Sequence, residues 1–145
     1  MPYATRQDVI DLRGREILLE VADLDGDGAL SADEEARVDR GLDYASAKID
    51  SYLRARYDLP LPSTPPELVE ICIDIALFRL EPNPALATER REKDYEMAIS
   101  WLKDVARGNV AIAAGSDADP APQVGGEVFL DGPDRAWTRE KTKGM

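Results

Sequence analysis

The spacing of apolar residues predicts helices through the first 107 residues of the chain. After Ser31, five apolar residues follow one another at intervals of four, three, four and four, which places them on one stripe of a long helix. They are Val38, Leu42, Ala45, Ile49 and Leu53. The segment from Pro65 to about Leu80 is apolar almost all round, so we expect it to be the central and most buried helix.

Capping residues and glycines indicate where the other helices begin and end. Thr5 with Asp8, and Ser31 with Glu34, have the spacing of capping boxes, in which two side chains satisfy the free N–H groups of a helix start. Gly14 separates a first short helix from a second one at about residues 15–22. The chain therefore reaches its long helix only after two short ones.

Prolines and a final glycine delimit the last part of this helical region. The proline-rich segment 58–66 is expected to be an extended connector, with Thr64 as N-cap and Pro65 at the first helical position. A last helix is expected from about Thr88 to Arg107, ended by Gly108. Its apolar face comprises Tyr95, Ala98, Leu102 and Val105.

The fold class that follows is all-α, a compact bundle of about four helices. Residues 1–107 form its body, and residues 108–145 form a long, extended C-terminal arm with little regular structure. Within the arm, residues 124–133 contain a short apolar run between turn residues, which allows a short β-strand. Only the body contains enough apolar residues to form a core.

Composition excludes several classes of function. The 145 residues include no histidine, which removes Ser-His and Cys-His nucleophile pairs and imidazole metal sites, so we expect no enzymatic activity. The net charge of −11 disfavours sequence-independent binding of DNA. Cys72 is the single cysteine and is expected to be buried, so no intrachain disulfide is possible. No apolar run is long enough for a signal peptide or membrane helix, and we expect synthesis in the cytoplasm.

Residues 23–34 match the calcium-binding loop of an EF-hand, which supplies oxygen ligands from positions 1, 3, 5, 7, 9 and 12 and has glycine at position 6. Gly28 stands at position 6, and helices are expected on both sides of the loop. An acidic, solvated turn is the alternative. Because calcium sensors usually pair two such loops and this chain has one, a structural Ca²⁺ is favoured over a switch. The expected ligands are Asp23, Asp25, Asp27, Ala29 through its carbonyl, Ser31 through water, and Glu34 in bidentate mode.

A pair of carboxylates interrupts the apolar central helix. Glu70 and Asp74 are four residues apart, so they share a face and repel each other. We expect them to be neutralised by one or more of three arginines, within the chain or across a subunit contact, and to be structural charges rather than an active site. These arginines are Arg54, Arg56 and Arg79.

The end of the chain has the opposite charge to the body. The last eleven residues contain four basic residues and one acidic residue, whereas the first 107 contain 14 basic and 23 acidic residues. An arm that becomes ordered on a partner is one interpretation, and a disordered solubilising tail is the other. The expected partner-binding residues are Phe129, Arg135, Trp137, Arg139, Lys141 and Lys143.

Several segments spread over nearly the whole chain resemble the Mu-like bacteriophage gp36 family. They are the opening residues 3–8, the acidic turn 23–28, the stretch 47–61, the short segments 65–66 and 74–76, and the ending Arg135-Ala136-Trp137-Thr138-Arg139. None of these segments is a catalytic signature.

The resemblance implies a head-to-tail connector, or adaptor, of a tailed phage. Such proteins are small helical bundles that assemble as a homo-oligomeric ring, expected to be a dodecamer, in the neck of the virion. The arm would reach the portal protein, and the opposite face would receive a tail-side stopper or tail terminator protein. DNA would pass through the lumen without specific binding, which an acidic wall favours.

A free cytoplasmic calcium-binding regulator is the competing hypothesis. It would use residues 23–34 as its single site and would be a monomer or dimer with an exposed groove, whereas the connector would form rings or co-purify with the portal.

Overall fold

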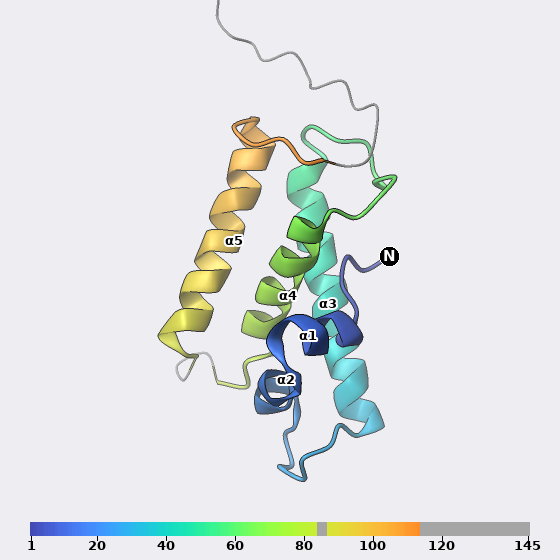
Figure 1. The fold of residues 1–145 in the computed structure, drawn as a ribbon, viewed down its shortest axis with the longest axis vertical. Helices are drawn as coiled ribbons and strands as arrows, with labels where there is room; N and C mark the ends of the chain where they lie inside the picture. Colours follow the sequence, from blue (N-terminus) through green and yellow to red (C-terminus); the bar gives the residue numbers. More distant parts are fainter. Residues whose placement is uncertain (84–86, 114–145) are drawn as a thin grey trace, which may run out of the picture.

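The protein is a bundle of helices, seen in a computed structural model that describes residues 1–83 and 87–113 (Figure 1). Five helices and no strand occur within these residues, which confirms the all-α class. They correspond to the five helical segments predicted along the sequence, one more than the overall count of about four. The helices are α1 (Arg6–Arg13), α2 (Arg15–Ala22), α3 (Ala32–Leu53), α4 (Pro66–Leu80) and α5 (Glu89–Arg107).

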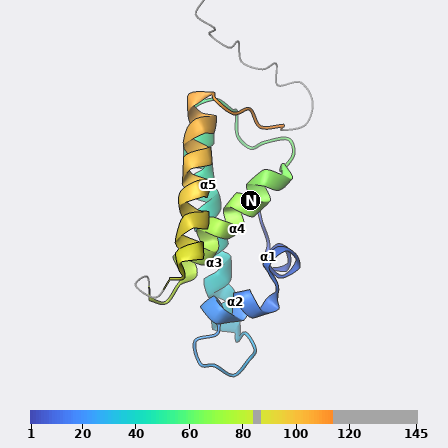
Figure 2. The ribbon, with the colours of Figure 1, turned by 60° about the vertical axis from the view of Figure 1, so that its left-hand side comes forward.

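The fifth helix arises because one glycine divides the N-terminal segment in two. Gly14 has φ 91°, a conformation that side chains with a Cβ rarely adopt, and its N–H donates to the carbonyl of Ile10 at the end of α1. The chain turns there and begins α2 immediately. Figures 1 and 2 show α1 beside α4 on the side away from α5, and α2 below α4, near the start of α5.

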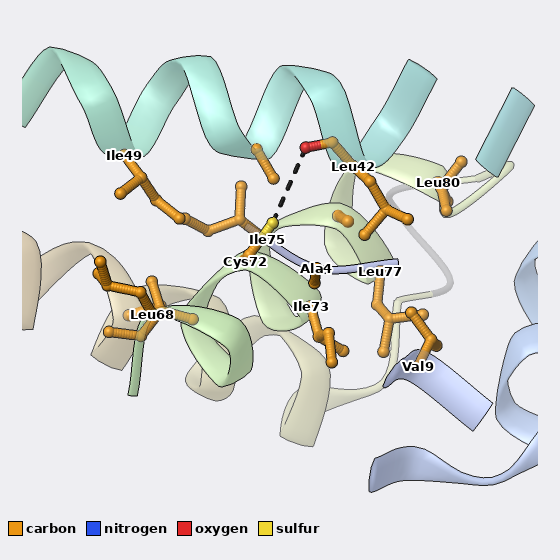
Figure 3. Close-up of a cluster of buried hydrophobic side chains, with 14 of the residues drawn as sticks. Ala4, Val9, Leu42, Ile49, Leu68, Cys72, Ile73, Ile75, Leu77 and Leu80 are labelled. Atoms are coloured by element: carbon orange, nitrogen blue, oxygen red, sulfur yellow. Dashed lines mark hydrogen bonds between the residues drawn. The ribbon is translucent and has the colours of Figure 1, made fainter. Parts of the chain in front are cut away.

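Helix α4 lies at the centre of the bundle, as its sequence predicted. It packs against α3 and α5 and also contacts the two short helices (Figure 1). Its side chains Leu68, Ile73 and Ile75 have no exposed surface, and Figure 3 shows them facing the surrounding helices. All five apolar residues of the predicted α3 stripe are also buried: Val38, Leu42, Ala45, Ile49 and Leu53. Burial of this apolar surface is the main force that holds the bundle together.

Both predicted capping boxes are present, and the predicted N-cap of α4 is wrong. Thr5 with Asp8 caps α1, and Ser31 with Glu34 caps α3. Helix α4 begins one residue later than expected. Pro65, in an extended conformation, occupies its N-cap position without a side-chain hydrogen bond, so Thr64 is not the cap. Proline is tolerated in the first turn of a helix but not in its interior. The two consecutive prolines are therefore compatible with a helix that begins at either of them.

The single cysteine is buried in the core, as expected. The Sγ atom of Cys72 lies 3.5 Å from the hydroxyl of Ser46 in α3, and burial raises the pKa of the thiol (Figure 3). The thiol therefore behaves as a small core residue rather than as a nucleophile. In the described ranges, none of the helices combines the length and the hydropathy that a membrane crossing requires.

The segment after α5 starts against the bundle. Gly108 ends α5 in the left-handed conformation, as predicted, with φ 85°. Ile112 is buried, and its N–H donates to the hydroxyl of Tyr57 at 2.9 Å. The beginning of the predicted arm thus packs on the body, and the strand predicted within residues 124–133 lies outside the described residues.

Candidate functional site

The loop between α2 and α3 carries the chemistry singled out in the sequence. It extends from one end of the bundle, remote from the end where α5 finishes (Figures 1 and 2). Gly26 and Gly28 have φ of 76° and 81°, so the sharp turn expected at Gly28 is present. Both values lie where glycine is favoured because it has no Cβ.

Three aspartates of the loop converge. Carboxylate oxygens of Asp23, Asp25 and Asp27 all lie within 4.8 Å of one another, and the side chains are exposed or half-buried. Backbone N–H groups compensate part of their charge. The N–H of Gly28 donates to Asp23 at 2.8 Å and that of Gly26 at 2.6 Å, which together hold the pKa of Asp23 below its usual value. Each carboxylate keeps free lone pairs, so the group can still accept a hard cation such as Ca²⁺.

Glu34 closes the loop on itself. Glu34 is only 6% exposed, and its carboxylate is not part of the three-aspartate group. One oxygen accepts the N–H of Leu24 at 2.6 Å, and the other accepts the N–H and hydroxyl of Ser31 at 2.9 and 2.8 Å. These bonds, led by the N–H of Ser31, lower the pKa of Glu34 to about 2. The carboxylate thus joins the start of the loop to its end.

The six predicted ligands are therefore only partly assembled around one point. The three aspartates are brought together, whereas Glu34 and Ser31 are engaged with each other at the start of α3. The N–H of Ala29 donates a hydrogen bond to the carboxylate of Asp27 at 2.8 Å. Calcium binding by these residues stays a prediction. What the geometry establishes is a loop whose acidic side chains are held by its own backbone.

The carboxylates of the central helix are paired within the chain, but not by the expected arginines. Arg13, in the last turn of α1, lies 2.8 Å from Asp74 and 3.3 Å from Glu70. None of Arg54, Arg56 and Arg79 makes this contact. The Asp74 side chain is 17% exposed, and burial raises its pKa while Arg13 acts in the opposite direction. The pair is a structural ion pair that fastens α1 to α4.

Two further arginines connect the helices, and neither was predicted from the sequence. Arg91 of α5 is buried and forms ion pairs with Glu81 and Glu20. Arg37 of α3 donates to carbonyls in the last turns of two other helices, those of Val21 and Leu80. Helical periodicity places such residues on a face but does not say which distant helix the face meets.

The predicted partner-binding residues lie outside the described residues. They are Phe129, Arg135, Trp137, Arg139, Lys141 and Lys143, and their role stays a prediction.

Comparison with known proteins identifies relatives along most of the chain. The family model described as "Bacteriophage Mu, Gp36" matches residues 3–130. The chain is 34% identical over 143 residues to "Mu-like prophage FluMu protein gp36" of Haemophilus influenzae, and the match covers 99% of this chain and 97% of the relative. It is also 33% identical over 90 residues to "Gene product J" of Escherichia phage Mu, with 62% of each chain covered.

Proposed function

The chain belongs to the bacteriophage Mu Gp36 family, and from this membership we propose that it is a non-enzymatic structural protein of the virion, the head-tail connector. In this proposal, twelve copies form a ring in the neck, between the portal protein and a tail-side stopper or tail terminator protein. In this role the chain contributes to assembly of the virion, and DNA passes through the ring that it forms.

The observation that carries the proposal is the length of the family match. It extends through residue 130, so it includes the helical body and continues into the segment that follows α5. A relationship of this extent means that body and C-terminal segment are inherited together. That is what a protein needs when one part forms the ring and the other part holds a neighbouring protein.

The distribution of charge supports the same arrangement. The helical body is acidic, and an acidic surface repels the phosphates of DNA, so packaged DNA would pass a ring of such bodies without adhering. The last eleven residues are basic and include Trp137, a combination suited to an aromatic anchor surrounded by charge-assisted contacts. Many copies acting on one symmetric partner would strengthen a weak single contact.

Portal binding by the C-terminal segment tests the proposal directly. The full chain and a variant lacking residues 124–145 would each be co-expressed with the portal protein of the same phage, and the portal would be purified. We expect the full chain to co-purify with the portal and the truncated chain to be absent from the purified portal. The circular dichroism and melting temperature of the truncated chain should stay close to those of the full chain. A truncated chain that still co-purifies in full amount would contradict the arm's role.

The number of copies is measured in the same preparation. Native mass spectrometry of the complex of full chain and portal is expected to give twelve copies of the chain per portal ring. Complexes with one or two copies, or a chain that never accompanies the portal, would contradict the connector proposal and favour a free regulator.

A further inference from the structure

We propose that copies of this chain bind one another through the two flanks of α3. The acidic flank, defined as Glu35, Asp39 and Asp43, would bind the basic flank of a second copy, defined as Arg40, Tyr44 and Arg79 of the neighbouring α4. The inference rests on the proposed ring and names the surfaces that would build it.

The two flanks border the two edges of the buried stripe of α3. Helical geometry places the acidic residues, four apart, along one edge, and it places Arg40 and Tyr44 along the other, so that the flanks adjoin each other across the exposed face of the helix. The neighbours confirm the two sides. Arg6 of α1 lies against the acidic flank, 2.6 Å from Glu35 and 3.0 Å from Asp39. On the other side, α4 ends against α3, where a Cβ added to Gly41 would lie 3.0 Å from Leu80.

The basic flank lacks an anionic partner of its own. Among the described residues, Arg40 makes no hydrogen bond or ion pair, and the contact that Arg79 makes is with the ring of Tyr44, 4.9 Å from its centroid. All three side chains are exposed, and Tyr44 is 45% exposed. The three side chains line a shallow hollow of about 440 Å³. Arg37 lines it as well, but its guanidinium donates hydrogen bonds to backbone carbonyls. Unpaired arginines beside an exposed aromatic ring suit an acidic protein surface.

The acidic flank keeps a negative surplus. Arg6 is the cation that contacts it, against three carboxylates, and the side chains of Glu35 and Asp39 remain 47% and 53% exposed. Asp43 is exposed and makes no ion pair in the part of the chain that the structure describes. These side chains rim a hollow of about 520 Å³ between α1 and α3, which also includes the apolar residues Ile10 and Leu30.

The relative placement of the flanks fits a ring. They occupy residues 35–43 and 40–44 of α3, so their levels along its axis overlap. A copy placed beside another in a similar orientation therefore brings an acidic flank against a basic one. Such a contact is heterologous, and heterologous contacts between identical chains continue until a rotation closes them into a ring. Complementary charge also overcomes the repulsion that bodies of net negative charge would otherwise have.

Charge reversal with exchange of partners tests this contact in the full chain. One variant reverses the basic flank (Arg40→Glu with Arg79→Glu), and a second reverses the acidic flank (Asp39→Arg with Asp43→Arg). Sedimentation velocity at low salt is expected to show concentration-dependent assembly of the wild type. Each variant alone should assemble at least about tenfold more weakly, since like charges then face each other.

Mixing the two variants gives the decisive result. Both flanks of one variant are then negative and both flanks of the other are positive, so an equimolar mixture is expected to recover assembly, with the two variants alternating. A chain that carries all four reversals is expected to recover assembly, because its flanks are again complementary. Control pairs elsewhere on α5, Lys103→Glu with Arg107→Glu and Glu92→Arg with Glu96→Arg, make the same changes in net charge and should assemble as the wild type does.

Three outcomes would overturn the inference. They are a wild type that stays monomeric at all concentrations, variants that assemble as well as the wild type, and an equimolar mixture of the two variants, folded as judged by circular dichroism, that assembles no better than either variant alone. In each case the connector proposal is judged separately by co-purification with the portal, so failure of the contact and failure of the function are distinguishable.

Discussion

The guanidinium of Arg13 lies 2.8 Å from the carboxylate of Asp74, across 61 positions of sequence. Arg13 ends the short helix α1, and Asp74 lies at the middle of the central helix α4. An eight-residue helix contributes few core residues, and in α1 only Val9 is buried. The ion pair therefore adds to the small apolar contact that fastens α1 to the bundle.

Replacing Arg13 by methionine is expected to destabilise the protein most at neutral pH. Asp74 would be left half-buried without a cation, which costs about 1 to 3 kcal/mol of the free energy of unfolding. Burial raises the pKa of Asp74 in the folded protein, so the protonated form is the one that folding favours. The penalty should therefore shrink as the pH falls through that pKa. Urea denaturation at several pH values measures it.

The control for this substitution is Arg90→Met. The Arg90 side chain is 91% exposed and its nearest carboxylate oxygen is 3.9 Å away, so its loss should change the free energy of unfolding by less than about 0.5 kcal/mol. Equal effects of the two substitutions, or a loss in Arg13→Met that does not depend on pH, would contradict the role assigned to the ion pair.

Glu34→Gln tests the carboxylate that closes the loop. Because the folded protein lowers the pKa of Glu34 from 4.5 to about 2, its ionised form stabilises the fold above pH 4.5, and this contribution is lost as the pH falls toward 2. The variant should melt at a lower temperature than the wild type at pH 6, and the difference should decrease between pH 4.5 and 2. Thermal melts in the presence of a chelator measure this without interference from metal ions.

The same substitution at an exposed position provides the comparison. Glu96→Gln on α5 is expected to melt as the wild type does at each pH. If Glu34→Gln also melts as the wild type does at pH 6, the hydrogen bonds from Leu24 and Ser31 do not hold the loop.

Calcium is predicted to raise the melting temperature by mass action on the folded state. Asp25→Asn with Asp27→Asn should abolish the increase, since it removes two charges while leaving oxygen acceptors for the backbone N–H groups. Calorimetry with Ca²⁺, Mg²⁺ or chelator measures the effect. A wild type whose melting temperature does not change with Ca²⁺ would show that the aspartates form a solvated turn held by its own backbone.

The fold was largely predictable because its determinants are local. The apolar spacing along α3, the mostly apolar α4 and the capping pairs are each patterns of neighbouring positions. Physical rules connect such patterns to helices without knowledge of the rest of the chain. The break between the two short N-terminal helices was predictable for the same reason, because a single residue, Gly14, interrupts the helical pattern there.

The site was less predictable for two reasons. Some of its contacts join residues far apart in the sequence, and one of its residues belongs to two motifs at once. Nothing in the sequence connects Arg13 to Asp74, since the contact depends on how α1 docks. Glu34 shows the other difficulty. It stands both at the twelfth position of a calcium loop and at the third position of a capping box, and the two patterns require the same residue. Only the hydrogen bonds show that the capping role is fulfilled.

If this chain joins the head of a phage to its tail, as we propose, then phage particles made without the chain should remain unjoined. A phage whose gene for this chain carries an early stop codon would be induced, and particles would be counted by electron microscopy with and without the full chain supplied in trans. The account predicts separate heads and tails that join when the chain is supplied. Particles that are joined and infectious without it would contradict the account.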